Sequence, residues 1–141
     1  MLRLRTTLLV MVIGVAPFGT GVAAPATCDD FLAITHKKPT QLDFVGCKQR
    51  FDLQGKPWQA TYRVRGVHAG EVERYLMKVF KVKKLTRTCC VWESINNSYR
   101  DAEFRPLVIS IATEETRVTS RARWREIPYF YVTVSVYPEA P

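Results

Sequence analysis

The sequence predicts an α+β fold: an antiparallel sheet of about five strands with two helices packed on one face, stapled by disulfide bonds. Two segments, 58–67 and 129–137, alternate apolar with polar side chains, which is typical of strands with one buried face and one solvent face. Segment 69–83 has apolar residues at helical spacing instead. Four cysteines are available for cross-links.

Residues 1–26 resemble a secretory signal peptide. Two arginines precede an apolar run over 8–16, which is shorter than the roughly 20 residues that cross a bilayer. Residues 24–26 read Ala-Pro-Ala and offer a cleavage site before Thr27. We therefore expect a periplasmic or secreted protein in which residues 27–141 form a single domain without a transmembrane span.

Two helices are expected. Thr27 can cap the first, which ends before Pro39. The second covers 69–83, where Val72 and Leu76 share an apolar face, acidic residues occupy the first turn and lysines the last.

The strands of the first half form a predicted hairpin. Segment 42–53 changes its apolar phase near Gly46, which indicates a bulge or bend, and a Gly-Lys-Pro turn separates it from strand 58–67.

The second half supplies the remaining strands. We expect one strand over 85–95, a polar loop over 96–101 and an apolar strand over 104–112. Segment 113–127 fits a short strand or a few helical turns equally well, and 129–137 is a strong strand ended by a proline.

The cysteines indicate two disulfide bonds, because an exported chain with an even number of cysteines usually pairs them. On a strand over 85–95, Cys89 would face the helices, which favours Cys28–Cys89 with Cys47–Cys90. Cys28–Cys90 with Cys47–Cys89, and Cys28–Cys47 with a strained Cys89–Cys90 ring, remain open. Adjacent cysteines lack the C-x-x-C spacing of zinc or thioredoxin-like sites, so structural bonds are favoured over metal or redox chemistry.

Several short motifs resemble a family of small exported proteins of Gram-negative bacteria, a domain of unknown function. They are Cys28-x-x-Phe31-Leu32, Lys38-Pro39, Cys47, Ala60-x-Tyr62-Arg63-Val64-x-Gly66 and Cys89-Cys90-x-Trp92-Glu93. The resemblance spans nearly all of the chain after the signal segment. It implies a periplasmic or secreted location and lends no catalytic residue.

Familiar catalytic and cofactor motifs are absent from the sequence. The glycines form neither a dinucleotide nor a phosphate loop, and there is no G-x-S-x-G elbow. The sequence therefore predicts no cofactor, no metal site and no catalytic set. The alternative is a small exported hydrolase-like enzyme that uses His68 or Glu93 in a cleft.

The basic balance is the remaining functional signal, since the chain carries a formal net charge of +8. Arginines and tyrosines gather on predicted solvent faces: Arg63, Arg65, Arg121, Arg123, Arg125, Tyr129 and Tyr131. They predict a non-catalytic binding or inhibitor (immunity-type) module. Its partner would be a protein or an anionic envelope component, and nucleic acid is not expected for an exported chain.

Overall fold

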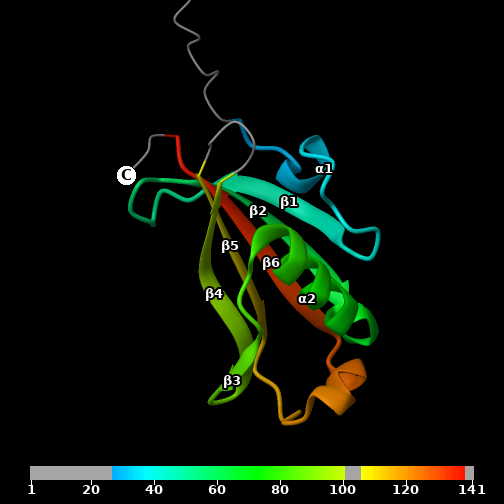
Figure 1. Cartoon of the computed structure of the whole chain (residues 1–141). Helices are drawn as coiled ribbons and strands as arrows, with labels where there is room; N and C mark the ends of the chain where they lie inside the picture. The colour runs from blue at the N-terminus through cyan, green and yellow to red at the C-terminus, as the bar shows by residue number, and fades with distance from the viewer. Residues whose placement is uncertain (1–26, 101–105, 139–141) are drawn as a thin grey trace, which may run out of the picture.

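The computed structural model describes residues 27–100 and 106–138, so the predicted signal peptide lies outside the described residues. Within them, six antiparallel strands form one sheet in the order β1-β2-β6-β5-β4-β3 (Figure 1). The strands are β1 (Asp43–Gln49), β2 (Trp58–Arg65), β3 (Thr86–Thr88), β4 (Val91–Arg100), β5 (Pro106–Thr113) and β6 (Tyr129–Val136). The predicted α+β class with an antiparallel sheet is confirmed, but the sheet has six strands rather than about five.

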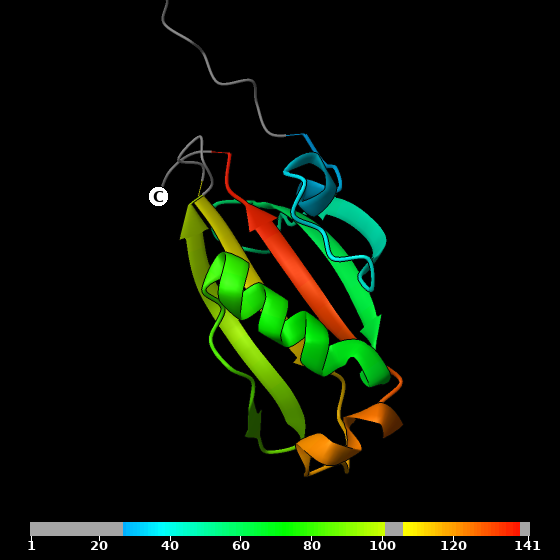
Figure 2. The ribbon, with the colours of Figure 1, turned by 45° about the vertical axis from the view of Figure 1, so that its right-hand side comes forward.

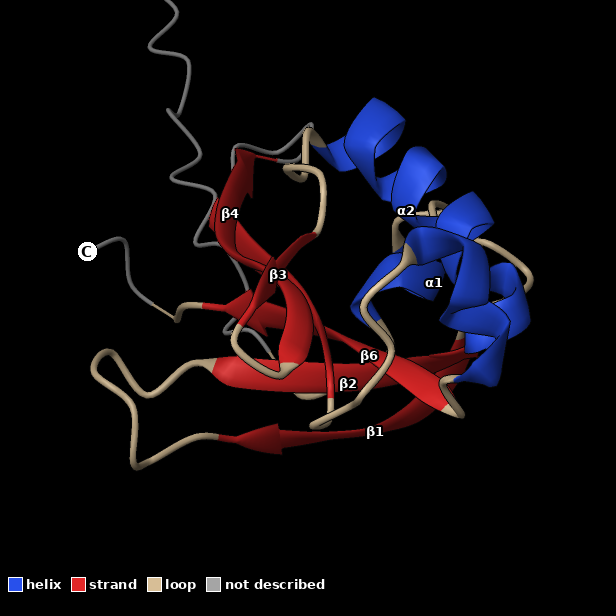
Figure 3. Cartoon of the chain, turned by 90° about the horizontal axis from the view of Figure 1, so that it is seen from below, coloured by secondary structure: helices blue, strands red, loops and turns tan. Residues whose placement is uncertain are grey.

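Helix α2 (Gly66–Phe80) crosses one face of the sheet (Figure 2). Helix α1 (Phe31–Ile34) lies on the same side of β1, β2 and β6 (Figure 3). The core between helix and sheet is apolar, because Val72, Leu76 and Phe80 of α2 are at most 1% exposed. Burying such side chains is the main stabilising term of the fold.

The start of α2 depends on a glycine. The helix begins at Gly66, three residues before the predicted Ala69 and directly after β2. A Cβ atom at Gly66 would overlap the carbonyl oxygens of Trp124 and Ile127. Because glycine has no side chain, the chain can pass from β2 into α2 in close contact with residues 124–127.

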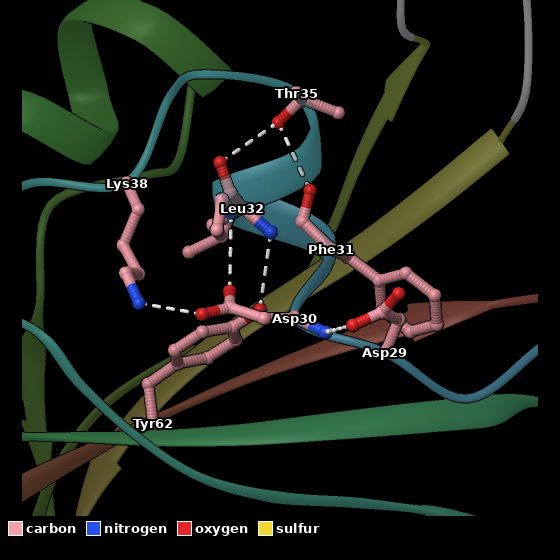
Figure 4. A network of polar contacts seen from close by, with 8 residues as sticks. Asp29, Asp30, Phe31, Leu32, Thr35, Lys38 and Tyr62 are labelled. Atoms are coloured by element: carbon pink, nitrogen blue, oxygen red, sulfur yellow. Dashed lines mark hydrogen bonds and ion pairs between the residues drawn. The ribbon is translucent and has the colours of Figure 1, made fainter.

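A small polar network fixes α1 to β2 (Figure 4). The buried hydroxyl of Tyr62 accepts a hydrogen bond from the backbone N–H of Leu32 at 3.1 Å. Asp30 caps α1 by accepting from the N–H of Ala33 at 3.1 Å and pairs with the ammonium of Lys38 at 2.5 Å. Partial burial would raise the pKa of Asp30, but the hydrogen bonds from Lys38 and Ala33 outweigh it and hold that pKa below its usual value.

The predicted hairpin of the first half is confirmed. Strand β1 pairs with β2, and their register shifts between Phe44 and Gly46, where the change of apolar phase indicated a bulge. The bulge places Asp43 opposite Arg63 on the solvent face.

The prediction of one strand over 85–95 is wrong. The chain reverses at Cys89 and Cys90, which form a two-residue turn between β3 and β4, with Thr88 opposite Val91. The reversal needs a positive φ, and Cys89 adopts 52°. Cysteine is not typical of such a turn, so the sequence pattern over 85–95 resembled that of one continuous strand.

The predicted polar loop over 96–101 is also wrong where the structure describes it, because β4 continues to Arg100. A bulge between Ser94 and Asn97 turns the polar side chain of Asn97 inward. Its amide donates to the carbonyl of Ile109 at 3.0 Å and accepts from the N–H of Lys83 at 2.8 Å. These bonds satisfy a buried polar group, so a polar residue is tolerated in the strand.

The disulfide pairing also differs from the favoured one. Cys28 bonds to Cys47, with Cα atoms 5.5 Å apart, and joins the segment before α1 to β1. Cys89 and Cys90 are free thiols at the hairpin turn. Both pairings that linked Cys28 and Cys47 to the adjacent cysteines are therefore wrong, because those cysteines lie at a turn rather than on a strand under the helices.

Strand β5 ends at Thr113, residues 114–120 form a loop, and a 3-10 helix, η1 (Arg121–Glu126), follows, so segment 113–127 holds helical turns rather than a second short strand. The Ser120 hydroxyl caps η1, and Trp124 is buried against the core at 4% exposure. The strong strand predicted over 129–137 is present as β6, which buries Phe130, Val132 and Val134 completely.

Candidate binding surface on the outer face of β2 and β6

Strands β2 and β6 divide their side chains between two faces. Ala60, Tyr62 and Val64 of β2 are buried under the helices. Their neighbours Arg63 and Arg65 point the other way and are exposed. The same alternation in β6 leaves Tyr129 and Tyr131 half-buried on this outer face.

The register of the two strands brings these four side chains together. Arg63 stands opposite Tyr131, and Arg65 stands opposite Tyr129. The Arg63 guanidinium also lies diagonally over the Tyr129 ring, 4.9 Å from its centroid, and the two tyrosine rings are 6.4 Å apart. We call Arg63, Arg65, Tyr129 and Tyr131 the Arg-Tyr patch.

An exposed carboxylate on β1 lies beside the patch. Asp43, on β1, lies 3.9 Å from the Nε atom of Arg63, and the two side chains are 67% and 46% exposed. A solvent-screened pair at this distance contributes little energy. The sequence alone does not single out Asp43, because its position opposite Arg63 depends on the bulge in β1.

The guanidinium of Arg121 is engaged by an internal partner, although the sequence placed it in the binding surface. Its guanidinium binds the buried Glu73 carboxylate through two bonds of 2.7 and 2.9 Å, and it donates to the Leu85 carbonyl at 2.7 Å. It also lies 4.4 Å from the centroid of the Trp124 ring. Arg121 thus joins η1 to α2 and has a structural role.

The remaining two predicted arginines lie on η1, away from the two strands that carry the patch. Arg123 donates two hydrogen bonds to Glu126, at 2.8 and 2.6 Å. These bonds lower the pKa of Glu126 and largely cancel the charge of Arg123. Arg125 is exposed on the same helix. The structure therefore gathers four of the seven predicted surface residues and separates the three arginines of η1 from them.

The alternative catalytic residues occupy separate elements. His68 lies in the first turns of α2, where its Nδ1 atom is 4.0 Å from the Glu71 carboxylate and its side chain is 48% exposed. Glu93 lies on β4, opposite Ala112 of β5. A cavity of about 960 Å³ opens between the ends of β1, β4, β5 and β6, and neither residue lines it.

The described residues contain no cluster of three or more side chains suited to hold a metal ion. None of their helices combines the length and the apolar character needed to cross a bilayer.

A family model described as a domain of unknown function (DUF4952) matches residues 20–92. The match covers all four cysteines, α1, α2 and strands β1 to β3, and it ends at the start of β4. A search of curated proteins found no match, and neither did a search of solved structures.

Proposed function

Since the chain belongs to this domain-of-unknown-function family, whose description assigns no activity, we propose from the surface itself that the protein is a non-catalytic binding module. The Arg-Tyr patch on the outer face of β2 and β6 binds an anionic partner, either an acidic protein surface or an anionic component of the cell envelope. An inhibitor or immunity-type protein is one form of such a module.

The observation that carries this proposal is the strand register, which sets two arginines beside two tyrosines on one solvent face. Each guanidinium offers several N–H donors in a planar fork that matches carboxylate or phosphate oxygens. The tyrosine rings add rigid contact area and a hydroxyl each, and both residue types are enriched where proteins bind one another. The cation–π contact of Arg63 with Tyr129 orients the guanidinium before a partner arrives.

The proposed location is the periplasm or the exterior of the cell. It is supported by the signal-like pattern of residues 1–26 and by the Cys28–Cys47 bond, since disulfides persist in oxidising compartments.

The test compares two double variants that each lose two positive charges, one in the patch and one outside it. Arg63→Gln/Arg65→Gln loses two charges in the patch, and Arg123→Gln/Arg125→Gln is the matched control on η1. Binding is measured by isothermal titration to a polyglutamate peptide and by co-sedimentation with vesicles of anionic phospholipid. We expect the patch variant to bind about tenfold more weakly, roughly 1.4 kcal/mol, and the control to bind nearly as the wild type does.

Equal losses in both variants would mean that net charge alone drives binding. That result, or unchanged binding by the patch variant, would contradict the proposal. If the patch variant alone loses binding, the probe that the wild type binds shows the kind of partner: the polyglutamate peptide indicates an acidic protein, and the vesicles indicate a lipid surface.

A further inference from the structure

The β3–β4 turn displays two adjacent free thiols that the proposed binding function does not use. Cys89 is exposed and Cys90 is half-buried. The turn consists of these two residues alone, since Thr88 and Val91 pair across it.

The backbone at Cys89 has an unusual conformation for a residue with a side chain. Its φ is 52°, which glycine adopts at little cost and which glycine or asparagine usually supplies in two-residue hairpins. Cysteine here carries a conformational penalty that glycine would avoid. The penalty is understandable if the sulfur atom itself has a role.

Neighbouring groups hold the turn in place. The Arg87 guanidinium donates to the carbonyl of Cys89 and, at 3.1 Å, to the carbonyl of Thr116. The N–H of Thr116 in turn donates to the carbonyl of Cys90 at 2.7 Å. Both turn carbonyls are therefore anchored, which holds the backbone of the turn in one conformation.

The two thiols are not equivalent. The pKa of Cys90 is raised, first by a hydrogen bond with Cys89, then by partial burial and by the nearby Glu115 carboxylate. Cys89 is the more accessible of the two thiols to an incoming molecule. Cys90, the less accessible thiol, suits the role of a resolving thiol.

We propose that Cys89 and Cys90 form a thiol–disulfide exchange site for low-molecular-weight disulfides of the glutathione class. The Cys89 thiolate attacks one sulfur of the disulfide RS–SR, which forms the Cys89–S–S–R bond and releases RS⁻. Cys90 then loses its proton and attacks the Cys89 sulfur, which forms the Cys89–Cys90 bond and releases the second RS⁻. The protein loses two electrons and two protons, and two RSH molecules result.

The product is a bond between neighbouring residues. Adjacent Cα atoms are ~3.8 Å apart across a trans peptide, less than the roughly 4.4–6.8 Å usual for disulfides. Such a ring is strained and easily reduced, so the exchange is reversible. Cys28 and Cys47, with Cα atoms 5.5 Å apart, lie inside the usual range and form the stable bond.

The test treats the purified, gently reduced protein with glutathione disulfide, alkylates the remaining thiols and maps the tryptic peptide Thr88–Arg100, which contains both adjacent cysteines and neither of the others. In the wild type we expect this peptide to escape alkylation and to be two hydrogen atoms lighter than the same peptide with both thiols reduced and unmodified. Cys90→Ser should accumulate a glutathione adduct on Cys89, and Cys89→Ser should react about tenfold more slowly.

Repeating the reaction in denaturing urea controls for misfolding, because the rate difference between the two variants should then vanish. A stable glutathione adduct in the wild type, a bond between two chains, an unreactive pair or equal rates for both folded variants would each overturn the proposal. So would tight zinc retention that blocks exchange, since the pair would then be a metal site.

Discussion

Breaking the pair between Glu73 and Arg121 should destabilise the fold far more than breaking a surface pair. The Glu73 side chain is 5% exposed and accepts hydrogen bonds from Arg121 and from the N–H of Leu85, at 2.8 Å. Removing one partner of a buried ion pair costs about 3–5 kcal/mol.

Arg121 is not fully buried, and this lowers the expected cost. Its side chain is 33% exposed, so water partly replaces a missing carboxylate. We therefore expect Glu73→Gln, which keeps an acceptor for Leu85, to cost about 2 kcal/mol. Arg121→Ala strands the buried carboxylate instead and should cost about 3 kcal/mol.

Urea unfolding followed by tryptophan fluorescence measures these costs, with a double-mutant cycle for the coupling. The pair Arg123–Glu126, 2.6 Å apart but on an exposed surface, is the control, and breaking it should shift the urea midpoint only slightly. Losses at Glu73 and Arg121 no larger than at this control would refute the structural role of Arg121.

Three further predictions concern stability. Gly66→Ala should cost at least about 2 kcal/mol in urea unfolding, because its Cβ atom would overlap the Trp124 carbonyl, and an unchanged midpoint would contradict the close approach. Asp30→Asn keeps the helix cap but loses the ion pair with Lys38. Because the pKa of Asp30 is lowered in the folded protein, its carboxylate stabilises the fold above the usual pKa of 3.8. This stabilisation disappears as the pH falls through the lower pKa of the folded state. The variant should therefore be about 1 kcal/mol less stable at pH 7 and equally stable well below pH 3.8, whereas a pH-independent difference would count against the pair. Cys28→Ala/Cys47→Ala removes a disulfide bond between residues 19 apart in the sequence and should lower the free energy of unfolding by about 3 kcal/mol. A double variant as stable as the oxidised wild type would argue against the bond.

The sequence predicted the local features of the fold well. Strict alternation marked the two faces of β2 and β6, and so predicted that Arg63, Arg65, Tyr129 and Tyr131 share the solvent face. The phase change at Gly46 marked a bulge that the register confirms. Each of these signals depends on residues within a few positions of one another.

Features set by distant partners escaped prediction. Arg121 turns inward because its guanidinium binds the buried carboxylate of Glu73, which lies on another element. Nothing near Arg121 in the sequence reveals this partner. The turn at Cys89 lacks the glycine or asparagine that announces a positive φ. With the turn missed, the disulfide pairing was also wrong, because it assumed that the adjacent cysteines sat on a strand.

Mapping backbone amide shifts by NMR during titration with polyglutamate peptide tests the binding proposal most directly, since it reports where the peptide touches. We expect the largest shifts on β2 and β6, around Arg63 and Tyr131, and their loss in Arg63→Gln/Arg65→Gln. Shifts that cluster instead on η1, or along the lysines that follow α2, would place the binding surface elsewhere and contradict the account.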